Sequence, residues 1–499
     1  MRKIMERQMK IGEVVISTIK FNLSCRDEIP KILIGLQHIY NTPSVRNEVF
    51  KILKDIVPKG TDSNNGRPGM DLWNILVLGT IRLGCNWDYD KLQEIADNHK
   101  TLRQMLGHGT FDDYCYSLQT LKDNVSLVTP EVLDKISQVV VKAGHTLVGK
   151  KEGGNLKGKC DSVVVETDVH YPTDINLLFD AIAKVIHLIT FLCLLVGIPG
   201  WRQSQHNIKK IKKLFRKAQN LKRSTAQDEK KKAERQEVII AAHQAYLDLV
   251  GSFLERVKET IKILREGHLS KEEKLQEVEK YIKDAERQIN QIRTRVIEGK
   301  DIPHDKKVFS IFEEHTEWIC KGKAGVSQEL GVRVCILDDQ YGFILHYQVM
   351  EKQTDDKVAV SMVKEAKEKF PGLSMCSFDK GFYTPMNKEE LKKLLDTVIL
   401  PKKGKLSSSD KEVEYSEEFI QARRKHSAVE SAINALENHG LDRCPDNGTA
   451  GFKRYVALAI LARNIQILGN IVQQKALKRQ RRIEKLERTR QDRSYCIAA

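Results

Sequence analysis

The chain has 499 residues, and its 83 Lys and Arg against 67 Asp and Glu give a formal net charge of +16. Hydrophobic residues make up 41% and charged residues 30%, which excludes a wholly disordered chain and is typical of several folded domains. The basic excess favours an anionic partner such as nucleic acid.

Ten cysteines are scattered without the paired spacing of a zinc ribbon or a thioredoxin-like motif, which favours a reducing cytoplasm. The N-terminal sequence MRKIMERQMK is charged and lacks the apolar core of a signal peptide. The longest uncharged run, residues 185–201, is shorter than the roughly 20 apolar residues of a membrane-spanning helix. We therefore expect a cytoplasmic protein with no membrane partner.

In chain order, apolar residues first recur at helical spacing, and residues 1–150 are expected to form an all-α region. The segment 160–169, CDSVVVETDV, is rich in β-branched residues and predicts a strand. Residues 179–300 then form a helical insertion, which begins apolar, becomes strongly basic and continues as long helices over 234–266 and 270–298.

Strands return after residue 301 and alternate with helices, ahead of a basic tail at 471–499. The expected elements are strands at 308–312, 331–337, 342–350, 373–378 and 397–400, and helices at 355–369, 387–396, 416–438 and 450–473. Without the insertion, this is the element order of an RNase H-like domain, an antiparallel meander followed by parallel strands with helical crossovers. We expect a mixed α/β fold in which residues 158–178 and 301–470 form one discontinuous RNase H-like sheet domain.

Three acidic residues occupy positions from which they could converge in such a domain. Asp161 starts the first strand, Asp379 follows the strand at 373–378, and Glu430 lies in the helix at 416–438. In an open sheet, ligand sites gather at the carboxyl ends of the strands. Asp168 is an alternative to Asp161, but it has the opposite parity, so a regular strand would direct only one of the two toward a shared site.

Carboxylates from separate elements can hold two Mg²⁺ or Mn²⁺ ions roughly 3.5–4 Å apart, an arrangement that supports phosphodiester chemistry. We therefore take Asp161, Asp379 and Glu430 as candidate metal-binding and catalytic residues, with two Mg²⁺ or Mn²⁺ ions as cofactors. Taken by its helix position alone, Glu430 is better explained as an ordinary surface acid, and the assignment depends on the other two acids.

Candidate DNA contacts come from basic segments. Residues 202–227 contain no acid, and their Lys and Arg recur at helical spacing to form one stripe. Phosphate contacts along such a stripe would make binding salt-dependent, whereas the alternative is a solvated helix face. The candidate DNA-binding residues of the chain are Lys209, Lys210, Lys212, Lys213, Arg216, Lys217, Lys402, Lys403, Arg423 and Arg424.

The acidic residues also lie in segments that resemble a known family. DDE transposases of bacterial insertion sequences, in particular the ISNCY-type group, are similar to most of the chain, including residues 24–40, 66–99, 102–109, 160–178 (CDSVVVETDVHYPTDINLL), 378–385 (FDKGFYTP) and 426–444 (HSAVESAINALENHGLDRC). The resemblance implies an RNase H-like core with Asp161, Asp379 and Glu430 as the DDE triad. It also implies an N-terminal region that binds transposon ends, and a location at the bacterial nucleoid.

The activity implied by the resemblance is hydrolysis at transposon ends followed by transfer of the freed 3′-OH into target DNA, within a homodimer or larger complex. One departure limits the transfer of roles. The Tyr, Arg and Lys of the family's Y-x2-R-x3-E-x6-K pattern are replaced by Arg423, His426 and Glu437, so the contacts of that pattern are not assigned here. Two other functions stay open: an RNase H-like nuclease without strand transfer, and a transposase-derived DNA-binding protein that has lost its chemistry.

Overall fold

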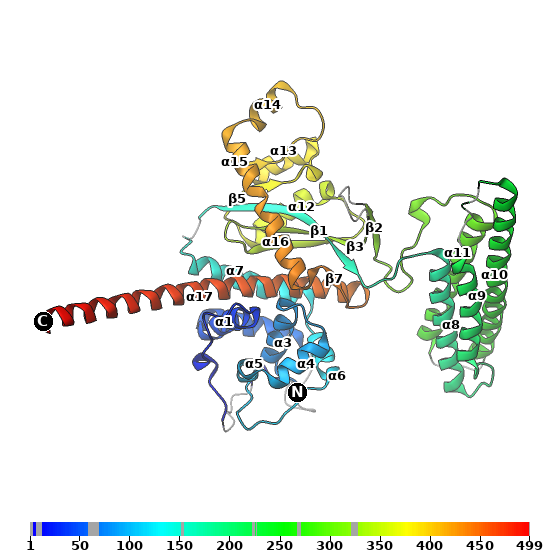
Figure 1. Cartoon of the computed structure of the whole chain (residues 1–499), viewed down its shortest axis with the longest axis horizontal. Helices are drawn as coiled ribbons and strands as arrows, with labels where there is room; N and C mark the ends of the chain where they lie inside the picture. The colour runs from blue at the N-terminus through cyan, green and yellow to red at the C-terminus, as the bar shows by residue number, and fades with distance from the viewer. Residues whose placement is uncertain are drawn as a thin grey trace. The chain divides into compact units, whose positions relative to one another are not determined.

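The computed structural model describes residues 3–5, 12–57, 69–150, 154–221, 225, 227–266, 271–320 and 328–498. The chain divides into two compact units, a sheet unit of residues 1–168 and 319–499 and a helical unit of residues 169–318 (Figure 1). The sequence predicted a helical insertion at 179–300. The helical unit of the structure is longer, because residues 169–178 and 301–318 also belong to it.

The sheet unit is built on a mixed seven-stranded sheet. Its strands are β1 (Leu156–Thr167), β2 (Glu317–Cys320), β3 (Gln328–Asp338), β4 (Ile344–Met350), β5 (Leu373–Phe378), β6 (Thr397–Ile399) and β7 (Arg443–Cys444). The strand order is β2-β3-β1-β5-β6, and in addition β4 pairs with β3 and β7 pairs with β1. β4, β3 and β1 pair antiparallel, and β1, β5 and β6 pair parallel. The expected mixed α/β class is confirmed.

β1 begins earlier than its sequence predicts. Residues 150–158 were predicted to form a loop, but Leu156 and Gly158 are buried and the strand pairs with β5 from its first residue. Asp161 therefore lies near the middle of β1 and not at its start. Because side chains alternate along a strand, Lys157, Lys159 and Asp161 share one face of the sheet.

The helices of the sheet unit that follow β4 are α12 (Asp355–Lys369), α13 (Pro385–Leu394), α14 (Ser408–Glu414), α15 (Glu417–His426) and α16 (Ala428–Leu436). The predictions for α12 and β5 match the structure residue for residue. The predicted helix at 416–438 is instead interrupted at Ser427, which separates α15 from α16. α15 contacts β5 and β6, and α16 contacts β1, so the two helices cross one side of the sheet (Figure 1).

Three other predictions differ from the structure. Residues 308–312 form no strand, because Ile311 and its neighbours pack into the core of the helical unit. The lysine-rich loop after β6 contains α14, which Ser407 and Asp410 stabilise with a capping box. The predicted basic tail is the continuation of α17, which runs as one helix over Gly448–Ala498.

The N-terminal helices share one hydrophobic core with the sheet. They are α1 (Glu28–Asn41), α2 (Pro43–Leu53), α3 (Leu72–Gly84), α4 (Tyr89–Asn98), α5 (Lys100–Met105), α6 (Leu118–Val125) and α7 (Pro130–Leu147). α1 and α17 cross closely because glycines meet backbone there: a Cβ on Gly469 would lie 1.8 Å from the carbonyl oxygen of Lys31. Asn464 of α17 also donates to Ser137 of α7 and to the Ile344 carbonyl of β4.

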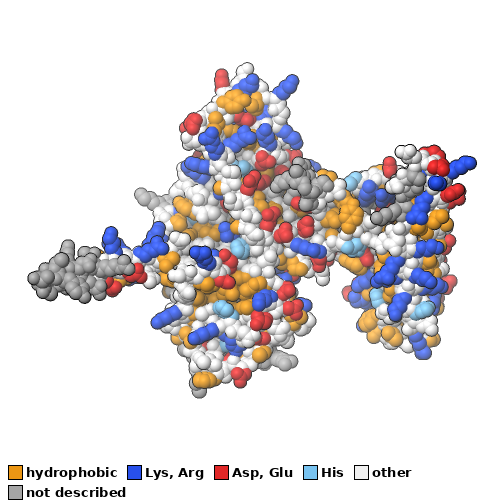
Figure 2. Space-filling model, in the orientation of Figure 1, with side chains coloured by type: hydrophobic (Ala, Val, Ile, Leu, Met, Phe, Trp, Pro, Cys, Tyr) orange, Lys and Arg blue, Asp and Glu red, His pale blue; other side chains and the backbone are white. Residues whose placement is uncertain are grey.

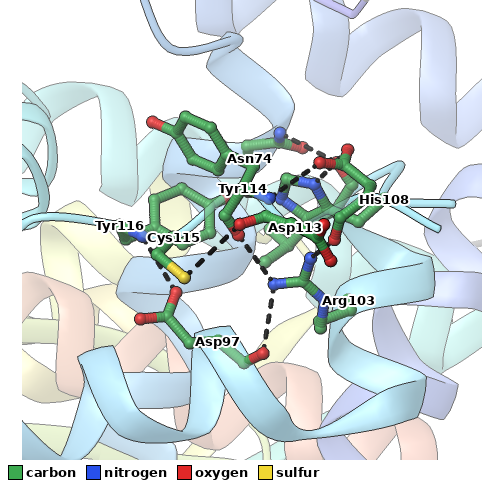
Figure 3. A network of polar contacts seen from close by, with 10 residues as sticks. Asn74, Asp97, Arg103, His108, Asp113, Tyr114, Cys115 and Tyr116 are labelled. Carbon is green, nitrogen blue, oxygen red and sulfur yellow. Dashed lines mark hydrogen bonds and ion pairs between the residues drawn. The ribbon is translucent and has the colours of Figure 1, made fainter. Parts of the chain in front are cut away.

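A polar network fixes the segment between α5 and α6 (Figure 3). Arg103 donates hydrogen bonds to the backbone carbonyls of Asp97, Asp112 and Tyr114. The His108 ring lies 2.9 Å from the Asp112 carboxylate and 2.7 Å from the Tyr116 hydroxyl. The Arg103 guanidinium thus satisfies backbone carbonyls of this irregular segment, and the His108 imidazole joins two of its side chains.

The helical unit is an α-helical bundle with its own core. Its helices are α8 (Asp174–Val196), α9 (Ser204–Asn220), α10 (Glu229–Glu266) and α11 (Glu272–Ile292), in agreement with the predicted helical insertion. Among the described helices, α8 and α17 are long and apolar enough to span a membrane by length and composition alone. Both also contribute buried residues to hydrophobic cores.

Candidate active site

The three candidate acids come from different elements of the sheet unit. Asp161 lies on β1, Asp379 directly follows β5, and Glu430 lies in the first turn of α16. β1 and β5 are parallel neighbours, with Cys160 beside Phe378, so each strand carries its acid to the same edge of the pair. α16 contacts β1, and this contact brings Glu430 toward the two aspartates.

The pKa of Asp161 records how close these charges are. The pKa of this carboxyl is raised from 3.8 to about 6, mainly by burial and against the effect of a hydrogen bond from the Ser162 N–H. The negative charges of Asp379, Asp355 and Glu430 make smaller contributions to the same rise. Asp161 is therefore partly desolvated and surrounded by carboxylates, while Asp379 and Glu430 are exposed to solvent.

Asp355 is an acid of this cluster that the sequence analysis missed. It is the first residue of α12, and it accepts a hydrogen bond of 2.7 Å from the Ser162 hydroxyl. A Cβ added to Gly381, in the turn after Asp379, would lie 3.0 Å from the Asp355 carboxylate. From the sequence, Asp355 reads as an acid at a helix N-terminus, which is a common position for purely local reasons.

His426, the last residue of α15, links that helix to β5, the strand that precedes Asp379. Its Nδ1 lies 2.9 Å from the Ser377 hydroxyl, and Ser377 is two residues before Asp379. Burial lowers the pKa of His426, while the charges of Asp379 and Glu430 raise it. His426 is the last residue of α15 and Glu430 lies in the first turn of α16, so this hydrogen bond fixes the end of α15 against β5 next to the acidic cluster.

Asp168, the alternative first acid, lies elsewhere. It directly follows β1, its side chain is exposed, and it pairs with Arg443. It is not among the charges that act on Asp161, whereas Asp379 and Glu430 are. The geometry therefore associates Asp161, and not Asp168, with the other two acids.

Oxygen donors of this kind suit Mg²⁺ and Mn²⁺, and a divalent cation would relieve the repulsion around Asp161. Within the described residues, however, no three His, Cys, Asp or Glu side chains are arranged to hold one ion as they stand. The donor chemistry thus fits such an ion, and its binding requires the side chains of the exposed acids to turn toward Asp161.

The six predicted basic residues of the insertion all lie on α9. Their side chains are exposed, while Ile211, Phe215 and Ala218 form the buried side of the helix. In the described part of the chain, none of the six pairs with an acid; they are Lys209, Lys210, Lys212, Lys213, Arg216 and Lys217. Figure 2 shows Lys and Arg side chains distributed over the visible surface of the helical unit. The expected basic stripe is thus solvent-facing.

The basic residues near the acidic cluster differ in their availability. Lys402 forms an ion pair of 2.5 Å with Asp410, so its charge is already used to hold α14. Lys403 is exposed, as are Arg423 and Arg424 in the last turn of α15. Lys402 is therefore a structural residue in this conformation, and the other three side chains are accessible to a ligand.

Comparison of the chain with family models, with curated proteins and with solved structures finds no match in any of the three.

Proposed function

We propose that this protein is a Mg²⁺-dependent DNA transposase with an RNase H-like catalytic domain. The observation that carries the proposal is the convergence of three acids from three elements: Asp161 on β1, Asp379 directly after the parallel neighbour β5, and Glu430 on α16, which contacts β1. The negative charges of Asp379 and Glu430 act on the Asp161 carboxyl. The pairings support the RNase H-like assignment, because β4 with β3 and β3 with β1 form an antiparallel meander and β5 and β6 follow as parallel strands.

Asp161, Asp379 and Glu430 would hold the two metal ions, with Asp355 beside them. When bound, such ions activate the attacking oxygen and stabilise the leaving oxygen of a phosphodiester. The chain itself positions the carboxylates, which β1, β5 and α16 orient. The exposed Lys and Arg side chains of α9 offer contacts to DNA phosphates. The reactions are hydrolysis at a transposon end and attack of the freed 3′-OH on target DNA, within a homodimer or larger complex.

The test uses the purified full chain, Mg²⁺, and a linear DNA that carries the gene with its natural flanking sequence, together with a supercoiled target plasmid. Asp379→Asn should abolish cleavage and leave DNA binding nearly unchanged, because the exposed acid contributes little to the fold. Asp168→Asn is the matched control, since it neutralises an exposed acid outside the cluster. Retained cleavage by Asp379→Asn would refute the assignment of the site.

The products separate this function from its alternatives. Joined molecules of flank and plasmid indicate strand transfer, whereas nicks without joining indicate an RNase H-like nuclease. Binding without any cleavage by the wild-type chain would indicate a DNA-binding protein that has lost its chemistry. Only the first outcome supports the proposed function.

A further inference from the structure

A groove of about 760 Å³ lies beside the acidic cluster, between α15 and the strands β1, β5 and β6. Ser377, which binds His426, lines this groove and is two residues from Asp379. The groove therefore opens next to the carboxylates without being part of them. Its volume falls in the range of pockets that hold one small molecule.

The inner wall of the groove is apolar. Met375 and Val398 of the sheet and Phe419 and Ala422 of α15 line it, and Phe419 is 6% exposed. A flat apolar group of a ligand can rest on such a surface and lose its contact with water, which is favourable in proportion to the apolar area covered.

The charges around the groove are separated. Lys157 on β1 and Lys425 in the last turn of α15 are exposed, and neither pairs with an acid among the residues that the structure describes. Asp396, directly before β6, and Glu418, in the first turn of α15, are also exposed. Lys157 lies beside Met375, and Met375 lies beside Thr397, which directly follows Asp396, so Lys157 is on the β1 side of the groove and Asp396 on the β6 side. Lys425 and Glu418 lie at opposite ends of α15.

The elements that carry Lys157 and Lys425 are also linked to the acidic cluster. Asp161 is also on β1, and Lys425 precedes His426, which is bound to β5. A ligand with one anionic group and one flat apolar group would place its anion near Lys157 and Lys425. A second anion near Asp396 or Glu418 would be repelled.

We infer that the groove binds one unpaired terminal nucleotide of the DNA substrate, with its phosphate at the cationic side and its base on the apolar wall. The inference rests on the proposed function and adds a substrate preference to it: the protein binds DNA ends with an unpaired nucleotide more tightly than blunt ends. Unpairing a terminal base in a duplex costs free energy, so a DNA end that is already unpaired binds without that cost.

The experiment measures fluorescence anisotropy of labelled duplexes in metal-free buffer, where no cleavage takes place. One duplex is blunt and the other carries a single unpaired nucleotide at the same end. The wild-type chain should bind the unpaired end about ten-fold more tightly, which is the effect of roughly 1.4 kcal/mol in binding free energy. A deoxynucleoside monophosphate in excess should remove this preference and leave binding of the blunt duplex unchanged.

Two variants test the location. Ala422→Trp fills the groove, and Lys425→Gln removes a cation at its rim; both should bind the two duplexes equally. Lys411→Gln is the control, because Lys411 is exposed on α14 and does not line the groove. Circular dichroism checks that the Ala422→Trp variant is folded. If that variant does not fold, the Lys425→Gln variant still tests the location of the site, because Lys425 is exposed.

Equal binding of both duplexes by the wild-type chain would overturn the inference, and so would a preference that survives Lys425→Gln. Failure of the proposed function is a separate result, because it is read from Mg²⁺-dependent products and not from binding. A chain that cleaves and joins DNA but ignores unpaired ends would retain the proposed function and lose the groove assignment.

Discussion

The burial of Asp161, together with the repulsion from neighbouring carboxylates, predicts that this residue destabilises the protein in the absence of metal. Raising the pKa of Asp161 from 3.8 to about 6 corresponds to at most about 3 kcal/mol, at about 1.4 kcal/mol for each tenfold change. The sign follows from the carboxylate form. Folding disfavours the ionised group, so the cost is absent below pH 3.8, grows as the pH rises, and is complete above about pH 6.

Asp161→Asn removes this cost and keeps the shape of the side chain, whose oxygen can still accept the hydrogen bond from the Ser162 N–H. At pH 7.5 in EDTA, the variant should unfold with a free energy up to about 3 kcal/mol higher than that of the wild type. At pH 4 or below the two proteins should be alike. Urea unfolding, followed through the tryptophan fluorescence of the sheet unit, measures the difference.

Added Mg²⁺ should reverse the order of stability, because a ligand that binds only the folded state stabilises it and the variant has lost one ligand. Asp168→Asn is again the control: the exposed pair with Arg443 contributes about 1 kcal/mol at most. A variant that is less stable than the wild type in EDTA at pH 7.5, or a gain that persists at pH 4, would refute the reasoning.

Two further predictions concern DNA binding and the arrangement of the site. The double variant Lys213→Gln with Arg216→Gln should reduce the steepness of the plot of log affinity against log salt concentration by about 2, close to one for each lost phosphate contact, without affecting thermal stability. Fluorescence anisotropy titrations at several NaCl concentrations measure this slope. An unchanged slope would exclude α9 as a DNA contact. His426→Ala and Ser377→Ala should each raise the Mg²⁺ concentration for half-maximal cleavage, and the double variant should be no worse than either, because both remove one hydrogen bond. Additive effects of the two substitutions would contradict this link.

The local pattern of the sequence was sufficient for several elements. Asp355–Lys369 has helical spacing and ends at a Pro-Gly pair, and Leu373–Phe378 is a short apolar run bounded by turn residues and an acid. Such segments are determined by neighbours in the chain, so their bounds agree with the structure. The antiparallel pairing of β3 and β4 was predictable for the same reason, since a short turn joins them.

Long-range contacts decided what the local pattern could not. Residues 156–158 were predicted as the end of a loop, and pairing with β5 makes them part of a strand. Ser427 carries no helix-breaking signal, yet the helix bends there where α15 lies on β5 and β6 and α16 lies on β1. Packing against the sheet, absent from the local sequence, sets both features.

The sequence by itself determined the identity of the three candidate acids, the basic stripe of α9 and the mixed α/β class, because charge, residue type and periodicity are properties of the chain. The tertiary structure decided which acids meet. Asp355 lies 194 positions after Asp161 in the chain, and the fold brings it to the Asp161 site through its hydrogen bond with Ser162. Asp168 instead forms an ion pair with Arg443. The fold also forms the groove beside α15. Electrostatic contact depends on distance in space, which the order of residues does not contain.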